Sequence, residues 1–300
     1  MFRSHPGRAI LGLAAAAALT LSATACGSES EDTSTGSASL PSASADTGLA
    51  GKVPADIKAA GKLVVGTDST YAPNEFVDTD GKSIVGFDVD LFNAVGQKLG
   101  LTTEWRAGKF DSIIPGVSSG KYTVGVSSFT INPDRLKEVD MVSYFSAGTQ
   151  WAAKAGATLN PDDACGKKIA VQTATVQADD IKARSKKCTD AGKPAITVDQ
   201  YQAQSDATNA VVTGKDEAML ADSPIAAYAV KQTGGQLALL GDIYDSAPYG
   251  YAVGKNQTEF ANVIAEAVKA LIADGTYKSI LDKWGVTAGG IDSPAVNPQA

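Results

Sequence analysis

Histidine is almost absent from this sequence, because its 300 residues contain only one, His5. His5 lies in a segment that we expect to be removed on export, so the exported protein would contain none. A chain without histidine can form neither the Ser-His and Cys-His pairs of nucleophilic enzymes nor a histidine-ligated zinc site. We therefore expect neither a metal nor a cofactor.

Long apolar runs and clusters of basic residues are also missing. The apolar stretch Ala9 to Leu21 is too short to cross a bilayer, which requires about 20 residues. The formal net charge is −7, and losing Arg3 and Arg8 with residues 1–25 leaves 24 basic against 33 acidic residues, or −9. So acidic a chain, without a basic cluster, argues against nucleic acid and anionic membrane surfaces as partners.

The N-terminus has the order of a signal peptide. Two arginines precede the apolar stretch, and the small residues Ala23-Thr24-Ala25 lie directly before Cys26. A lone cysteine there resembles the lipobox of bacterial lipoproteins, although leucine is more usual where Ala23 stands. We expect residues 1–25 to be removed and Cys26 to be lipidated, which would anchor the exported protein to the outer face of the cytoplasmic membrane. The alternative is a soluble secreted protein cut nearby.

Residues 26–52 contain mostly Ser, Thr, Gly, Ala and acidic residues. A segment with so little apolar surface is predicted to be a flexible tether. With about 25 residues, its root-mean-square reach would be roughly 25–30 Å. The folded part could then stand off the membrane.

Cysteine is scarce as well. Besides Cys26 the sequence has only Cys165 and Cys188. Two thiols in an exported chain favour one disulfide over a metal site. Because they lack CxxC spacing, we expect this disulfide to have a structural role.

Short apolar runs alternate with amphipathic segments along the rest of the chain. Such alternation predicts an α/β fold in which helices cover a mainly parallel sheet, in two similar halves. We expect strands near residues 62–67, 102–105, 122–126, 168–171, 195–198, 218–221, 237–240 and 249–253. We expect helices near residues 88–99 with Asp88 as N-cap, 110–119, 176–186, 205–213, 224–233, 259–273 and 276–284.

Polar residues follow several of the predicted strands. Ser127, Ser128 and Thr130 come after the run Val124 to Val126, where a strand is predicted to end, and Arg135 lies one turn further on. Hydroxyls, free N–H groups and a guanidinium at a strand end can bind a small carboxylate, although a solvated loop with a surface arginine is the alternative. Other residues in such positions, which could equally be helix caps, are Asp68, Gln172 and Asp222.

The sequence resembles family 3 of the bacterial extracellular solute-binding proteins, the receptors of amino-acid ABC importers. The resemblance covers about residues 62–285. The motifs that carry it are Gly66-Thr67-Asp68, Tyr71-Ala72-Pro73, Gly86-Phe87-Asp88-Val89-Asp90-Leu91, Phe110 to Pro115, Ser127-Ser128 with Thr130 and Arg135, and Asp274 to Tyr277 with Lys283-Trp284. It implies a two-lobed periplasmic-binding-protein-like fold of type II, with lobe 1 at residues 53–147 and 246–290, lobe 2 at 148–245, a two-segment hinge and a tail at 291–300.

The resemblance also implies roles for single residues. Arg135 would bind the ligand α-carboxylate with Ser128, Thr130 and the loop after Gln172, where Thr175 and Val176 stand. Asp222 would bind the α-ammonium, which Ser127 or Ser128 could share, while Tyr71 and Phe110 would enclose the ligand side chain and Asp68 would lie at its far end. Three residues depart from the family pattern: Ala174 replaces the usual glycine, Val176 a residue that is often hydroxylated or glycine, and Asn74 adds a residue that leaves the role of Glu75 open.

The implied activity is binding without catalysis, by a monomer that closes on a free amino acid and delivers it to ABC transporter permease subunits. An enzyme on the same fold, such as a cyclic amino-acid dehydratase acting through Asp222 or Asp68, and a ligand-sensing lipoprotein are the alternatives. The segment around Gln172 offers no second cation for an acidic side chain. We therefore expect a polar or cationic ligand, either glutamine or one of arginine, lysine and histidine.

Overall fold

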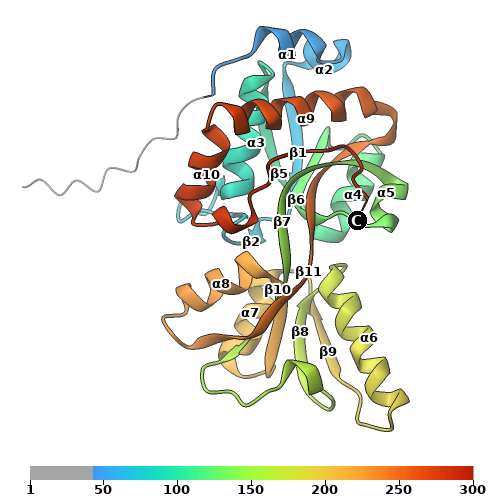
Figure 1. Cartoon of the computed structure of the whole chain (residues 1–300), viewed down its shortest axis with the longest axis vertical. Coiled ribbons are helices and arrows are strands. Elements are labelled where there is room, and N and C mark those ends of the chain that lie inside the picture. Colours follow the sequence, from blue (N-terminus) through green and yellow to red (C-terminus); the bar gives the residue numbers. More distant parts are fainter. Residues whose placement is uncertain (1–42, 300) are drawn as a thin grey trace, which may run out of the picture. The chain divides into compact units, whose positions relative to one another are not determined.

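The computed structural model describes residues 43–299, which Figure 1 colours along the sequence. The predicted signal peptide, with His5, and the predicted lipidation site Cys26 lie outside the described residues. Between Ala43 and Gln299, no helix is both long and apolar enough to cross a membrane.

An eight-stranded sheet organises the fold. Its strands are β1 (Lys62–Thr67), β5 (Thr102–Ala107), β6 (Val124–Thr130), β7 (Val139–Lys154), β8 (Lys168–Gln172), β9 (Thr197–Tyr201), β10 (Ala218–Asp222) and β11 (Leu237–Gly254). They lie in the order β5-β1-β6-β11-β7-β10-β8-β9. β1 is parallel to β5 and β6, and β8 is parallel to β9 and β10, as the alternating pattern predicted.

Two long antiparallel strands, β7 and β11, connect the two parallel groups. Figure 1 shows both of them running from one half of the sheet to the other. We call the half with β1, β5 and β6 lobe 1, and the half with β8, β9 and β10 lobe 2. A small sheet of β2 (Thr70–Tyr71), β3 (Glu75–Val77) and β4 (Ile84–Val85) follows β1 in lobe 1. The predicted two-lobed α/β fold is confirmed.

Helices cover the sheet in each lobe. Lobe 1 has α1 (Thr47–Lys52), α2 (Ala55–Ala60), α3 (Phe87–Lys98), α4 (Phe110–Ser118), α5 (Pro133–Glu138), α9 (Thr258–Ala273) and α10 (Thr276–Trp284). Lobe 2 has α6 (Val176–Asp190), α7 (Gln204–Thr213) and α8 (Ser223–Gln232). Three 3₁₀ turns span Pro161–Asp163, Lys255–Gln257 and Thr287–Gly289.

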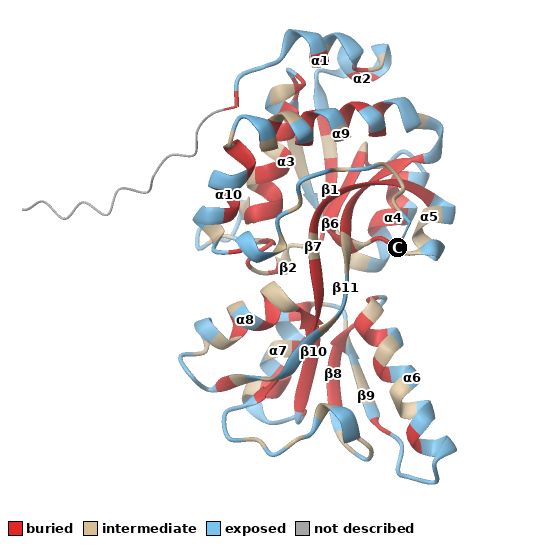
Figure 2. Cartoon of the chain, in the orientation of Figure 1, coloured by how far each residue is buried: buried red, intermediate tan, exposed pale blue. Residues whose placement is uncertain are grey.

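Apolar periodicity explains how these helices pack. The predicted stripe of α9 is buried against lobe 1 through Phe260, Ile264, Val268 and Leu271, which recur at helical spacing. A second cluster, which includes Ile113 and other residues of α4, lies elsewhere in lobe 1, and lobe 2 likewise contains two clusters. In Figure 2 the buried positions follow the strands and the inner faces of the helices.

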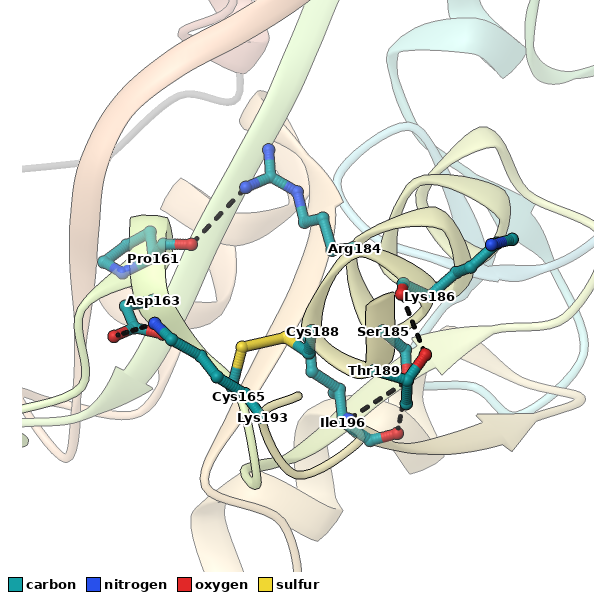
Figure 3. Close-up of a disulfide and its surroundings, with 10 residues drawn as sticks. All are labelled: Pro161, Asp163, Cys165, Arg184, Ser185, Lys186, Cys188, Thr189, Lys193 and Ile196. Carbon is teal, nitrogen blue, oxygen red and sulfur yellow. Dashed lines mark hydrogen bonds and ion pairs between the residues drawn. A yellow bond between two sulfur atoms is a disulfide. The ribbon is translucent and has the colours of Figure 1, made fainter. Parts of the chain in front are cut away.

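The predicted disulfide is present. Cys165 and Cys188 are joined with a Cα–Cα distance of 5.6 Å, which links the segment before β8 to the last turn of α6. Figure 3 shows the surrounding contacts, among them the ion pair between Lys193 and Asp163. Cys188 is buried in a core of lobe 2, so the disulfide fastens the C-terminal end of α6 to that core.

The two ends of the described chain are more ordered than predicted. The tether expected over residues 26–52 cannot reach that far, because Asp46 caps α1 and Leu49 is buried in the core of lobe 1. The tail expected over residues 291–300 is held against β7, where the N–H of Ser143 donates to the carbonyl of Ala295 at 2.9 Å. Both segments are poor in apolar residues, so composition alone does not reveal the few contacts that fix them.

Strand ends were also predicted inaccurately. β6 was expected to end at Val126, but β11 pairs with it as far as Thr130. The two strands expected at residues 237–240 and 249–253 are parts of the continuous β11, and β9 begins two residues later than predicted, at Thr197. In these places the backbone hydrogen bonds come from pairing with a distant strand. The local sequence does not indicate such pairing.

The prediction that Asp88 caps α3 is wrong. Gly86 holds the cap position with φ of +141°, and a Cβ there would lie 2.0 Å from the carbonyl oxygen of Asn74, so only glycine fits. Asp88 lies inside the first turn and is fully buried. Its carboxylate is therefore turned into lobe 1.

Candidate functional site

A small cavity of about 10 Å³ lies between residues of the two lobes. Lobe 1 contributes residues from β2, α4, β6 and α5, and lobe 2 contributes the N-terminus of α6 and the end of β10. The lining consists of Tyr71, Phe110, Ser128, Thr130, Arg135, Thr175, Val176, Gln177 and Asp222. All of these except Gln177 were predicted as site residues.

Arg135 enters the cavity from α5, a short helix that starts with Pro133 and is capped by the Asn132 side chain. Its Nη1 donates to the carbonyl of Thr130 at 2.8 Å, and its Nη2 donates across the cleft to the carbonyl of Ala174 at 3.2 Å. The guanidinium also lies 5.4 Å from the ring centre of Phe110. Burial lowers the pKa of Arg135 to about 10, so the side chain stays positive at neutral pH.

Asp222 approaches the same cavity from the end of β10. It occupies the cap position of α8, yet its side chain accepts no capping hydrogen bond, so the alternative of a simple helix cap is wrong. Its Oδ2 accepts from the Tyr71 hydroxyl at 2.7 Å, and its Oδ1 accepts from Nε2 of Gln177 at 2.8 Å. Burial raises the pKa of Asp222, while these donors and the charge of Arg135 oppose that rise.

Arg135 and Asp222 are opposite charges that line one cavity without being paired. Across residues 43–299, neither side chain takes part in any salt bridge. A buried charge without a counter-charge is costly, and such groups are usually paired. The cavity wall therefore carries one positive and one negative side chain, each of which a ligand of opposite charge could neutralise.

The N-terminus of α6 supplies part of the wall opposite Arg135. Thr175 caps this helix by accepting from the N–H of Ala178 at 3.1 Å. The first-turn N–H groups of Val176 and Gln177 have no partner within an α-helix and favour an anion. Ala174, just before the cap, has φ of +60°, which accounts for the usual glycine of the family at this position.

Three predicted site residues lie behind the lining instead of in it, namely Asp68, Ser127 and Gln172. The Oδ1 of Asp68 accepts from the N–H of Thr70 at 3.1 Å and from its hydroxyl at 2.7 Å. The Oδ2 accepts from the N–H of Phe110 at 3.1 Å and from Nε2 of Gln172 at 2.9 Å. Donors of the protein itself thus hydrogen-bond to both oxygens of the carboxylate that was expected at the far end of the ligand. Burial raises the pKa of Asp68.

Ser127 is turned away from the cavity as well. Its hydroxyl accepts from the N–H of Asp68 at 3.0 Å and donates to Oε1 of Glu75 at 3.0 Å. Ser128, the next residue, does line the cavity and has φ of +52°. Its hydroxyl also lies 3.3 Å from Oε2 of Glu75, so the hydroxyls of both serines contact the same buried acid.

Direct hydrogen bonds join the lobes around the cavity. Besides the Tyr71–Asp222, Asp68–Gln172 and Arg135–Ala174 contacts, the N–H of Gln204 donates to the Thr70 hydroxyl at 3.1 Å. The rings of Phe76 in lobe 1 and Tyr228 in lobe 2 also lie 6.3 Å apart. The cleft between the lobes is closed in this structure.

Gln177 was not predicted as a site residue. Its Nε2 donates to Asp222 and, at 3.1 Å, to the hydroxyl of Thr149 on β7. The available signal was its position two residues after the Thr175 cap, which places it in the first turn of α6. Among residues 43–299, no group of His, Cys, Asp and Glu side chains is arranged to hold a metal ion.

The family described as bacterial extracellular solute-binding proteins, family 3, matches residues 63–287. The chain belongs to this family. One relative, the arginine-binding protein ArgT of Corynebacterium glutamicum, is 34% identical over 250 residues, which cover 82% of this chain and 82% of that protein. The family is extracellular and consists of solute-binding proteins, in agreement with the predicted class.

Solved structures of family members have the same fold. An ancestral arginine-binding protein with arginine bound is 36% identical, with a TM-score of 0.69, and the match covers 75% of this chain and 98% of that one. An ancestral arginine-binding protein with glutamine bound is 34% identical, with the same TM-score of 0.69 and the same coverage of 75% and 98%. These relatives are binding proteins for amino acids.

Proposed function

We propose that this protein is the extracytoplasmic substrate-binding component of an ABC importer for a polar or cationic amino acid. The observation that carries the proposal is a pair of charges that form no salt bridge in the described chain. They are the half-buried Arg135 from lobe 1 and the buried Asp222 from lobe 2, in the lining of one closed cavity. The α-carboxylate and α-ammonium of a free amino acid are the complementary pair of charges.

The residues around each charge fit this assignment. Near Arg135, the Thr130 hydroxyl and the first-turn N–H groups of α6 are donors for a carboxylate. Asp222 is held by Tyr71 and Gln177, which leaves room on its oxygens for further donors such as an ammonium group. A ligand that bridges the two charges would also bridge the two lobes and would thereby stabilise the closed form.

The lining also supports a ligand class. Tyr71 and Phe110 offer aromatic walls for the ligand side chain, and Arg135 is the sole cation among the lining residues of the described chain. A second carboxylate on the ligand would therefore be buried without a counter-charge, which disfavours glutamate and aspartate. The relatives solved with arginine and with glutamine support the proposed range, which is glutamine or one of arginine, lysine and histidine.

Lipidation at Cys26 would anchor a monomer to the outer face of the cytoplasmic membrane, and the segment after Cys26 would let the folded part reach the permease subunits. The role proposed is binding and delivery without catalysis. Incubating the purified protein with its ligand and finding a chemically changed product would instead favour the dehydratase alternative.

Thermal-shift screening of the twenty amino acids tests the proposed function. A ligand at 100 times its dissociation constant adds about 2.7 kcal/mol to the free energy of unfolding. We expect glutamine or the basic amino acids to raise the melting temperature. Stabilisation by glutamate or aspartate alone would reject the ligand class, and no stabilisation by any amino acid would reject the function.

A further inference from the structure

Two carboxyl groups, of Glu75 and Asp88, are buried together directly beneath the serines of β6. Both residues are completely buried. Oε1 of Glu75 accepts from the Ser127 hydroxyl at 3.0 Å, and Oε2 lies 3.3 Å from the hydroxyl oxygen of Ser128. The cavity lining contains neither acid, so neither has a role in the proposed contacts to the ligand.

Asp88 receives several donors on one oxygen and none on the other. Its Oδ2 accepts from the Tyr144 hydroxyl at 2.6 Å, from the N–H of Ser128 at 3.1 Å and from the Ser128 hydroxyl at 3.1 Å. Its Oδ1 is buried and finds no donor among the side chains and backbone of the described chain if Glu75 is ionised. A proton on Glu75 would supply that donor, because both carboxyl groups lie against the same Ser128 hydroxyl, Glu75 at 3.3 Å and Asp88 at 3.1 Å.

The groups around the pair are acids and phenols. Those whose charge interacts with the pair are Asp68 after β1, Tyr71 of β2, Tyr144 of β7 and Tyr251 of β11. In the described part of the chain, no lysine or arginine forms a salt bridge with either acid. Two adjacent buried negative charges without a cation are strongly disfavoured, so one carboxyl group retains its proton.

We propose that Glu75 is a positioning residue for the binding site: it stays protonated, donates to Oδ1 of Asp88, and so holds Ser128 in the cavity wall. The two serine hydroxyls and the Asn74 amide then each have an acceptor. Ser127 donates to Glu75, Ser128 donates to Asp88, and Nδ2 of Asn74 donates to the Ser128 hydroxyl oxygen at 2.8 Å. Burial, followed by the charge of Asp88, raises the pKa of Glu75 well above its ordinary value, which agrees with this arrangement.

Ser128 needs this support because its backbone is in the left-handed region, with φ of +52°. Residues other than glycine rarely adopt that conformation, and it persists only where the surroundings hold it. Here the hydrogen bond from the Ser128 N–H to Asp88 holds the backbone. Loss of the proton from Glu75 would place a second negative charge against Asp88 and would displace the acceptor on which Ser128 depends.

Infrared spectroscopy of the ligand-free protein at neutral pH tests the protonation directly. We expect a carbonyl band of a protonated carboxylic acid that disappears in Glu75→Gln. The matched control is Glu104→Gln, which changes a partly exposed glutamate paired with Lys62 and Arg106 and should leave the band in place. Absence of the band in the unmodified protein, or its persistence in Glu75→Gln, would overturn the proposal.

Calorimetry with L-arginine and L-glutamine tests the positioning role, and this arm rests on the proposed function. The amide of Glu75→Gln can donate to Asp88 and accept from Ser127, so affinity should stay within about threefold, whereas Glu75→Ala should lose about tenfold or more. Equal losses in the two variants, or no loss in either, would overturn the role. If the unmodified protein bound neither probe, the proposed function would fail, and the infrared result would still decide the protonation of Glu75.

Discussion

Arg135 is the residue on which the proposed site depends most. Its side chain is half-buried, forms no salt bridge in the described chain, and is held by the carbonyls of Thr130 and Ala174. Carbonyl oxygens orient a guanidinium but do not neutralise its charge. The strongest contact is therefore left for a ligand carboxylate.

Arg135→Ala is expected to weaken amino-acid binding by about two decades or more, because a charge-assisted bidentate contact in a closed site is lost. Isothermal titration calorimetry with L-arginine and L-glutamine measures the loss. Arg106→Ala is the matched control, since Arg106 is half exposed and pairs with Glu104 on β5. Near-native affinity of Arg135→Ala would remove the centre of the proposed function.

The Asp68 carboxylate is hydrogen-bonded to other groups of the protein, although it was expected at the ligand. The resemblance places this acid at the side-chain end of the ligand, where its removal would weaken a cationic ligand most. In the structure four donors of the protein occupy its carboxylate, and one of them, Gln172, comes from the other lobe. Its main role in the closed form is therefore to join the lobes.

Asp68→Asn is accordingly expected to weaken L-arginine and L-glutamine by similar factors, because it loosens closure for both ligands. We expect a loss of about tenfold for each, the scale of one charge-assisted hydrogen bond. Paired titrations of the two ligands measure the ratio. A loss confined to arginine would instead show that Asp68 contacts the ligand side chain.

At the scale of elements, α6 has a different task at each end. Its N-terminus forms part of the cavity wall, and its C-terminal turn carries Cys188. A helix of 15 residues is about 22 Å long, so the disulfide lies far from the ligand. Stability and binding should therefore respond differently to changes at the disulfide.

The double variant Cys165→Ser with Cys188→Ser should lower the free energy of unfolding by roughly 3.5 kcal/mol, since the bond closes a loop of 23 positions. Urea denaturation measures that difference. Amino-acid affinity, measured on the same preparation, should not change. An unchanged midpoint, or a large loss of affinity, would contradict the separation of the two tasks.

On the scale of the whole molecule, the buried acids make stability depend on pH. Burial is the largest cause of the raised pKa values of Asp68, Glu75 and Asp222, and it raises the pKa of Asp88 to about 6. A raised pKa means that the folded state holds protons more tightly than the unfolded state. These groups therefore stabilise the fold below their ordinary pKa values, and that contribution is lost as the pH rises.

The ligand-free protein should consequently become less stable between about pH 5 and pH 7, where Asp88 loses its proton. Thermal unfolding across that range, with buffers matched for ionic strength, measures the decline. Asp88→Asn should flatten the curve because the titrating group is gone. A stability that rises through this window in the unmodified protein would contradict the assignment.

Short stretches of the chain were enough to predict the class of the protein and most of its helices and strands. The period of apolar residues is a local property. It was therefore sufficient to predict α9, β1 and the alternation of strands and helices that builds a two-lobed fold. Motifs were sufficient to name eight of the nine residues that line the cavity. These features follow from short stretches of chain, each of which can be recognised without the others.

The surroundings of each side chain became known only once the folded arrangement of distant segments was seen. The hydroxyls of both serines on β6 contact Glu75, which lies beneath the strand, and only Ser128 also lines the cavity. Asp88, expected as a cap, is buried instead, and Asp68 is occupied by donors from both lobes. Burial, charge pairing and hydrogen-bond partners depend on segments far apart in the chain, so no local pattern in the sequence could have fixed them.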